Sequence, residues 1–134
     1  MKMTYMLETD WAVYYLRGKE EIIDRLDEFQ PQGIGLSIIS LAELYAGVYY
    51  SNSPVTAKED LDNLLSSVKI LGVNEEICRI FGEENARLRK YGQIIADFDL
   101  LIAATCLNHG LKLLTNNLRH FDRIKDLEII SIDF

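Results

Sequence analysis

Acidic and amide side chains stand at four places where this sequence predicts a strand to end or a helix to begin. These places are Glu8-Thr9-Asp10, Glu43, Asp97-Phe98-Asp99 and Thr115-Asn116-Asn117. Carboxylate and amide oxygens are the hard ligands that Mg²⁺ and Mn²⁺ accept, and a divalent cation can activate water and meet a phosphate. The residue types are therefore compatible with metal-assisted hydrolysis of a phosphodiester, provided that the fold brings the four places together.

The elements needed to do this are predicted from periodicity and capping residues. Apolar runs predict strands at 4–7, 33–38, 69–73, 111–114 and 128–132, and helical spacing predicts helices at 11–17, 19–29, 40–48, 54–68, 75–91, 97–109 and 119–124. Strands that alternate with helices predict an α/β fold with a mainly parallel central sheet of four to five strands and helices on both faces. In such sheets the ligand crevice lies at the carboxyl ends of the strands, where the acids are placed.

Length and composition indicate a single domain over residues 1–134. Two prolines and eight glycines punctuate the 134 residues, and no Ser/Gly/Pro-rich linker divides them. The net charge of −7 argues against a protein that grips nucleic acid mainly by neutralising phosphates, but not against a nuclease whose cations meet the phosphate. No apolar run reaches the roughly 18 residues of a membrane span, so we expect no membrane association and a cytoplasmic location.

Asp99 is the most informative acid. The helix predicted around it is apolar on nearly every side, with Leu100, Leu101, Ile102 and Ala103 following directly. A carboxylate on a buried helix needs a metal ion or a paired base, because an isolated buried charge costs several kcal/mol. The alternative is an acid favoured in the first turn by the helix dipole alone.

The other candidates have stronger structural alternatives. Glu43 lies off the apolar stripe of its helix and would look the same as a solvated surface residue. Glu8 or Asp10 can serve simply as the cap of the helix that follows, and Asn117 as a turn residue. His120 has no neighbour at metal-ligand spacing.

Four segments together resemble, in order and spacing, the PIN-domain ribonucleases of the VapC toxin family. They are Tyr5-Met6-Leu7-Glu8-Thr9-Asp10, Ser40-Leu41-Ala42-Glu43-Leu44-Tyr45-Ala46-Gly47, Asp97-Phe98-Asp99-Leu100-Leu101-Ile102-Ala103-Ala104 and Leu114-Thr115-Asn116-Asn117-Leu118-Arg119-His120-Phe121. The resemblance covers almost the whole chain and implies a single PIN-like domain. It also implies a metal-dependent endoribonuclease that acts as the toxin of a toxin-antitoxin pair and is blocked by a cognate antitoxin.

The resemblance also implies roles for individual residues. Glu8, Glu43, Asp99 and Asn117 match the positions that hold one or two Mg²⁺ or Mn²⁺ ions and cut RNA to 5′-phosphate and 3′-hydroxyl ends. Glu8 and Asp99 would be direct metal ligands, Glu43 would hold a second metal or orient the attacking water, and Asn117 would fix a metal-bound water. Supporting hydrogen bonds are expected from Thr9 and Thr115, and Asp97 is expected as a further supporting residue.

Glu8 departs from the family pattern, which has Asp at this position. The extra methylene displaces the carboxylate from the position that an octahedral cation demands, so the sequence predicts weakened or absent activity.

Two other functions fit parts of the sequence. Asp97-Phe98-Asp99-Leu100 superficially resembles the nucleophile loop of haloacid-dehalogenase-type phosphatases, but no hydrophobic strand precedes it and the chain is short for that fold. A catalytically silent PIN-like module that binds a partner protein or RNA is the second alternative, with Glu8 as the sign of lost chemistry.

Basic and aromatic residues suggest partners. The basic clusters Arg87, Arg89, Lys90 and Arg119, His120, Arg123, Lys125 flank the acids in sequence and would either line an RNA path or form a solvated face. Aromatic and apolar residues crowd two helices, and part of their surface is expected to form an interface; these are Trp11, Val13, Tyr14, Tyr15, Tyr45, Val48, Tyr49 and Tyr50. The resemblance implies that the partners are a second copy of the chain, in a homodimer, and the antitoxin, in a groove.

Overall fold

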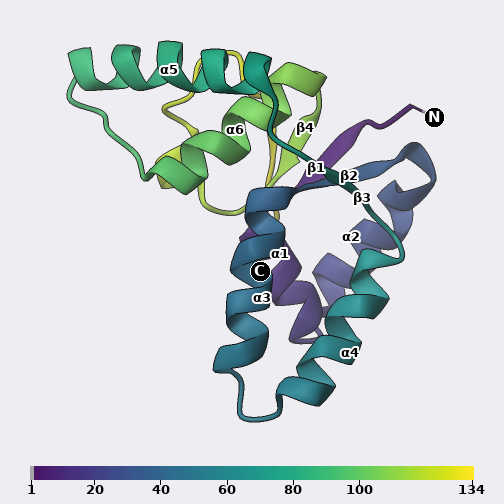
Figure 1. Ribbon diagram of the computed structural model, residues 1–134. Coiled ribbons are helices and arrows are strands. Elements are labelled where there is room, and N and C mark those ends of the chain that lie inside the picture. Colours follow the sequence, from purple (N-terminus) through teal and green to yellow (C-terminus); the bar gives the residue numbers. More distant parts are fainter. Residues whose placement is uncertain (1) are drawn as a thin grey trace.

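A five-stranded, all-parallel sheet organises the chain, with strand order β3-β2-β1-β4-β5 (Figure 1). The computed structural model describes residues 2–134. The strands are β1 (Tyr5–Leu7), β2 (Ile34–Ser37), β3 (Lys69–Leu71), β4 (Lys112–Leu114) and β5 (Ile129–Ile130). The helices are α1 (Thr9–Leu16), α2 (Glu20–Phe29), the 3₁₀ turn η1 (Gln30–Gln32), α3 (Ile38–Tyr50), α4 (Pro54–Leu65), α5 (Glu75–Lys90), α6 (Asp97–His109) and α7 (Leu118–Phe121).

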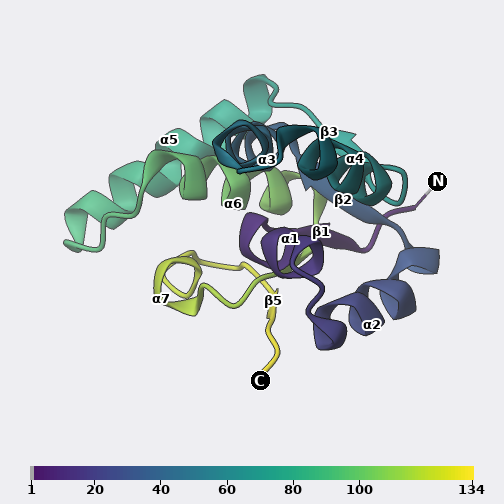
Figure 2. The same cartoon turned by 90° about the horizontal axis from the view of Figure 1, so that it is seen from below.

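Helices cover both faces of the sheet, as the alternating side chains of β1 show. Tyr5 and Leu7 belong to the apolar core that contains α1, α2, α3 and α4, whereas Met6 belongs to the core formed with α5, α6 and α7. Figure 2, seen from below, shows α7 and β5 on the far side of α1 from α4. The predicted fold class is thus confirmed.

The strand register aligns the ends that carry the chemistry. Leu7 at the end of β1 pairs with Leu36 in β2 and with Leu114 in β4. The chain continues from these strands into Glu8, Ile38 and Thr115, and the Glu8 amide donates to the carbonyl of Leu114 at 3.1 Å. Three segments far apart in sequence therefore leave the sheet side by side at the carboxyl ends of β2, β1 and β4.

Several helix and strand ends differ from the sequence prediction. Helix α1 begins at Thr9 because Glu8 is its N-cap, and α3 begins at Ile38 because Ser37 accepts from the amide of Ile39. Helix α7 ends at Phe121, three residues before the predicted end. Strand β5 is shorter than predicted because the backbone of Ile132 pairs with a side chain and not with β4.

The aromatic residues predicted to form an interface divide between core and surface. Trp11 is fully buried and Val48 is 4% exposed, so both belong to the apolar core. Tyr49 and Tyr50, at the end of α3, are 73% and 94% exposed. Within residues 2–134, no helix is long and apolar enough to cross a membrane.

Candidate functional site

Glu8 stands at the junction of β1 and α1 and is 4% exposed. Its Oε2 accepts from the backbone amide of Asp10 at 3.2 Å, which caps α1. Its Oε1 lies 2.7 Å from the hydroxyl of Thr115, which donates from the residue directly after β4. The carboxyl group is thus held by the first turn of α1 and by the residue that follows β4.

Asp10, which the sequence placed after the first strand as a candidate acid or a helix cap, is hydrogen-bonded to the same loop as Glu8. Its Oδ2 accepts from the amide of Asn116 at 3.0 Å, and its Oδ1 lies 3.1 Å from the Thr115 hydroxyl. Since one hydroxyl proton serves one acceptor at a time, the shorter contact to Glu8 is the better hydrogen bond. Asp10 therefore clamps the loop after β4 to the first turn of α1.

Burial raises the pKa of Glu8 from 4.5 to about 8, and the negative charge of Asp10 adds to the rise. The hydrogen bond from Thr115 acts in the opposite direction because it stabilises the charged form. Without a cation nearby, the buried carboxyl group of Glu8 is hence protonated near neutral pH.

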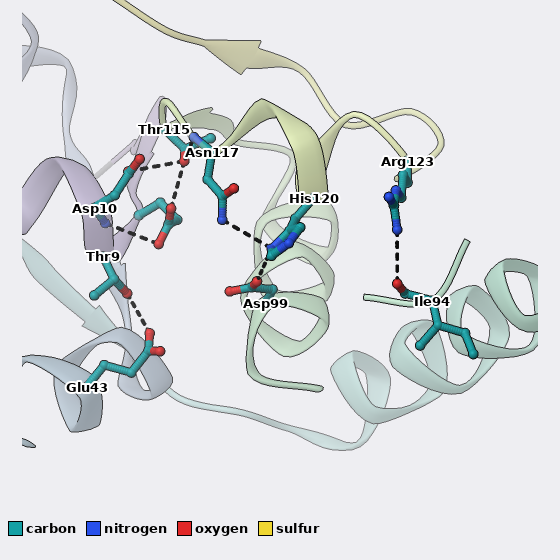
Figure 3. A network of polar contacts seen from close by, with 10 residues as sticks. Thr9, Asp10, Glu43, Ile94, Asp99, Thr115, Asn117, His120 and Arg123 are labelled. Carbon is teal, nitrogen blue, oxygen red and sulfur yellow. Dashed lines mark hydrogen bonds and ion pairs between the residues drawn. The ribbon is translucent and has the colours of Figure 1, made fainter. Parts of the chain in front are cut away.

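Glu43, on α3, points toward Thr9 at the start of α1 (Figure 3). The hydroxyl of Thr9 lies 2.7 Å from Glu43 Oε1 and 2.9 Å from the hydroxyl of Ser40. Glu43 is half-buried and is held by a residue adjacent to Glu8, so it is not the freely solvated side chain that its helical position allowed.

Asp99 has the paired base that its buried helix demands. Its side chain is 17% exposed, and its Oδ2 lies 2.8 Å from Nδ1 of His120 on α7. The amide nitrogen of Asn117 lies 3.3 Å from the same ring nitrogen. A protonated Nδ1 donates to Asp99 and cannot also accept from Asn117, so the shorter contact defines the hydrogen bond. Sequence spacing gave no signal for His120.

Asn116, to which the sequence assigned no role of its own, joins three segments. Its Oδ1 accepts from Trp11 Nε1 at 3.0 Å and from the amide of Ile132 at 2.9 Å, while its Nδ2 donates to the carbonyl of Ile132 at 2.8 Å. These bonds hold the loop that carries Thr115 and Asn117 against α1 and the C-terminal segment.

Asp97 differs from the other predicted residues. It occupies the first position of α6 and is exposed, and no hydrogen bond or ion pair involves its side chain within residues 2–134. No contact of the Asp97 side chain therefore supports its predicted role.

Some residues of the predicted basic clusters form hydrogen bonds and ion pairs within the domain. Arg87 pairs with Glu84 at 2.8 Å and donates to the carbonyl of Arg123 at 2.6 Å. Arg123 in turn donates to the carbonyl of Ile94 at 3.0 Å, as Figure 3 shows. These two arginines secure the loop between α5 and α6, while Arg119 is exposed on α7.

The donor atoms match a hard divalent cation in type. Glu8, Glu43 and Asp99 offer carboxylate oxygens, each held by a donor from another segment, and Asn117 offers an amide oxygen. In the part of the chain that the structure describes, no three Asp, Glu, His or Cys side chains converge into a ready metal cage. Mg²⁺ is commonly held by one or two carboxylates together with waters and substrate phosphates, so this donor set fits it without such a cage.

The sequence matches the PIN domain family over residues 5–127. It is 33% identical to Ribonuclease VapC1 of Haemophilus influenzae strain R2866 over 94% of this chain and 96% of that protein. It is also 33% identical to Ribonuclease VapC2 of Rickettsia felis, over 98% and 99%. The chain belongs to the VapC ribonucleases of the PIN-domain family. Its place there agrees with the resemblance that the four sequence segments indicated.

Solved structures of VapC-containing complexes share the fold over nearly the full length. VapBC2 from Rickettsia felis, bound to a DNA fragment from its promoter, matches with a TM-score of 0.92 and 32% identity, covering 98% of this chain and all of that chain. DNA-bound VapBC from Salmonella typhimurium matches with a TM-score of 0.90 and 27% identity, covering 96% and 98%. The tRNA(fMet)-specific endonuclease VapC of Salmonella typhimurium is 27% identical over 95% of this chain.

Proposed function

We propose that this VapC family member is a divalent-metal-dependent endoribonuclease and the toxin of a toxin-antitoxin pair. The observation that supports the proposal is that Glu8, Glu43 and Asp99 are each hydrogen-bonded to a residue of the segments that follow β1 and β4, namely Thr115, Thr9 and His120. Neither a phosphatase nucleophile nor a purely binding module requires this arrangement. The activity is expected in the cytoplasm, where RNA and a co-expressed antitoxin meet.

Glu8, Asp99 and Glu43 would hold Mg²⁺ or Mn²⁺, and Asn117 would fix a water at its edge. When bound, the cation lowers the pKa of a water and neutralises charge that develops on the scissile phosphate. The protein's own contribution is orientation: Thr115 holds Glu8, Thr9 holds Glu43, and His120 holds Asp99. Water attack with departure of the 3′ oxygen leaves 5′-phosphate and 3′-hydroxyl ends.

The test is RNA cleavage by the wild type, by Asp99→Asn and by Asp24→Asn, which removes an exposed acid on α2. A panel of RNAs that includes tRNA serves as substrate because the sequence does not specify the target RNA. We expect cleavage by the wild type and by Asp24→Asn in Mn²⁺, none in EDTA, and a loss of about 100-fold or more in Asp99→Asn, the range seen when a positioned electrostatic group is removed. Equal cleavage by Asp99→Asn would refute the metal site, and RNA binding without any cleavage would favour the silent module.

A groove between α1, α3 and α4 is the proposed docking site for the antitoxin. Its volume is about 280 Å³, and its lining is mainly apolar with Glu43 at one place on the wall; the lining residues are Val13, Leu16, Arg17, Glu43, Leu44, Gly47, Val48, Ala57 and Asp60. The structural neighbours from Rickettsia felis and Salmonella typhimurium are VapBC complexes. An apolar segment with Arg or Lys side chains fits both the groove and the acids beyond it.

Self-association is the remaining partner prediction. Tyr49 and Tyr50 present more apolar surface at the end of α3 than one small domain needs to expose, and we propose that this chain forms a homodimer. Light scattering at micromolar concentration tests the proposal, and a strict monomer would contradict it.

A further inference from the structure

The segment that follows β5, residues 131–134, is attached to the loop between β4 and α7 by the side chain of Asn116. Backbone pairing ends where the amide of Thr115 donates to the carbonyl of Ile130 at 3.1 Å. Beyond that point Asn116 Oδ1 accepts from the amide of Ile132 at 2.9 Å, and its Nδ2 donates to the carbonyl of Ile132 at 2.8 Å. A primary amide can donate and accept as a peptide group does, so Asn116 extends the pairing of β4 with β5.

The other end of this segment is attached to the first two helices. The Phe134 ring lies edge-on to Tyr14 of α1, with ring centroids 5.1 Å apart, and Lys19 Nζ, at the N-cap of α2, lies 4.4 Å from the Phe134 centroid. Figure 2 shows the chain leaving β5 past α1 toward this point. Phe134 is 53% exposed and belongs to neither apolar core, so its contacts can be removed without opening a cavity.

The loop that Asn116 anchors carries two residues of the candidate site. On one side, Thr115 is fully buried and donates to Glu8 Oε1 at 2.7 Å. On the other side, the amide of Asn117 donates to the Thr115 hydroxyl oxygen at 3.0 Å. Asn116 Oδ1 also accepts from Nε1 of the fully buried Trp11 at 3.0 Å. A displacement of Asn116 would therefore disturb the donor that orients Glu8 and would leave a buried indole N–H without its partner.

We propose that Asn116 is a positioning residue for the loop of residues 115–117, and that residues 131–134 act through it to hold the site in its working geometry. The inference rests on the proposed nuclease function and adds that the site depends on a segment that contributes none of the proposed metal ligands. Asp10 accepts from the Asn116 amide at 3.0 Å and keeps the loop near α1 when the segment is released. We therefore expect a loosened loop in a folded domain, with weaker metal binding and slower cleavage.

The first measurement uses neither metal nor RNA. Backbone hydrogen exchange, followed by NMR in EDTA, reports how often the loop opens. We expect Phe134→Ala to speed exchange at the amides of Asn116 and Asn117 about five-fold, the size of one edge-to-face aromatic contact, and to leave the amides of β1 and β2 unchanged. Phe134→Tyr keeps the ring and should exchange as the wild type. Tyr91→Ala is the matched control, since Tyr91 is an exposed aromatic with Lys90 Nζ 5.9 Å from its ring, and it should not affect the loop.

The second measurement connects the loop to the site. In Asn116→Ala we expect the Kd for Mn²⁺, measured by titration calorimetry, to rise about ten-fold and kcat for RNA cleavage to fall by a similar factor, as when a group that supports a metal ligand is lost. KM for RNA should stay the same, because the loop positions the acids and is not proposed to bind the RNA. Asn63→Ala, which removes an exposed asparagine on α4, is the control and should change neither value.

The double variant Asn116→Ala/Phe134→Ala tests whether the segment acts through Asn116. It should match Asn116→Ala alone in Mn²⁺ affinity and kcat, whereas additive effects would overturn the inference. Unchanged loop exchange in Phe134→Ala, which keeps the core intact, would also overturn it. Faster exchange spread over all strands would show a general structural role and contradict the proposal. Absent cleavage by the wild type with the exchange differences retained would refute the nuclease function and still support the link between segment and loop, so the two failures are distinguishable.

Discussion

The pKa of Glu8 makes the stability of the metal-free protein depend on pH in a direction that can be worked out. Burial and the charge of Asp10 raise the pKa from 4.5 to about 8 in the folded protein, whereas the unfolded chain returns Glu8 to water. Between these values the folded protein keeps the proton and the unfolded chain releases it. The free energy of unfolding therefore falls as pH rises through this range.

The magnitude follows from the two pKa values. Below about pH 4.5 Glu8 is protonated in both states and causes no loss, and above about pH 8 it is ionised in both and the full loss is reached. At about 1.4 kcal/mol per pH unit, the loss across the range is at most roughly 5 kcal/mol. We expect a few kcal/mol, since a charged Glu8 draws its surroundings toward water.

Glu8→Gln isolates this contribution. Glutamine keeps the length of the side chain and an oxygen for the Thr115 hydroxyl, but it cannot ionise. Urea denaturation in EDTA from pH 5 to pH 8.5 should show the wild type losing stability relative to Glu8→Gln as pH rises.

Glu59→Gln, an exposed acid on α4, is the matched control and should show a flat difference from the wild type over the same range. A flat difference for Glu8→Gln as well would refute the reasoning, because Glu8 would then titrate as a solvated carboxyl group. Asp10→Asn should lower the pKa of Glu8 and move the loss of stability to lower pH, since it removes the second cause of the shift.

Three further predictions follow from the site and the groove. Mn²⁺ should raise the Tm of the wild type and of Asp24→Asn by several degrees but hardly that of Asp99→Asn, since a ligand that binds only the folded form stabilises it; equal shifts in all three would contradict the metal site. Glu8→Asp should increase RNA cleavage several-fold and leave stability within about 1 kcal/mol, because Asp is a good N-cap for α1 and the shorter side chain restores the family pattern; unchanged or lower activity would mean that the site is built around Glu. Gly47→Arg should abolish binding of the antitoxin encoded by the adjacent reading frame, measured by calorimetry, because Gly47 lines the groove. Gly82→Arg on α5, outside the groove lining, is the control and should leave binding unchanged. Both variants should fold, since a Cβ at either helical glycine meets no atom within 4 Å.

Local sequence patterns predicted the elements well because each is determined by residues close together in the chain. The apolar run of β1 and the nearly all-apolar α6 follow from neighbours alone, as does the Asn74 cap that accepts from the amide of Ile77 at 2.9 Å. The same reasoning predicted that Asp99 requires a partner.

The identity of that partner could not be predicted, because it depends on how distant elements pack. His120 reaches Asp99 across 21 residues, and Asn116 reaches Trp11 across 105. The local pattern allowed either Glu8 or Asp10 to cap α1; Glu8 does so, and Asp10 instead accepts a hydrogen bond from the loop after β4. When the partner of a side chain is set by sheet topology, periodicity and spacing in the sequence do not predict that partner.

The hydrogen bonds around the acids divide them by how their charge is balanced. Thr115 and Thr9 are neutral donors, so they orient Glu8 and Glu43 without removing their charge. Among these three acids, within residues 2–134, only Asp99 contacts a base, His120. With Asp10 nearby, the metal-free site holds more negative charge than its burial tolerates, and a proton on Glu8 relieves it. A cation that binds Glu8 must displace that proton, so the affinity of the site for the cation should rise with pH until Glu8 is ionised. The burial that makes Glu8 a weak acid also means that its ionised form requires a cation beside it.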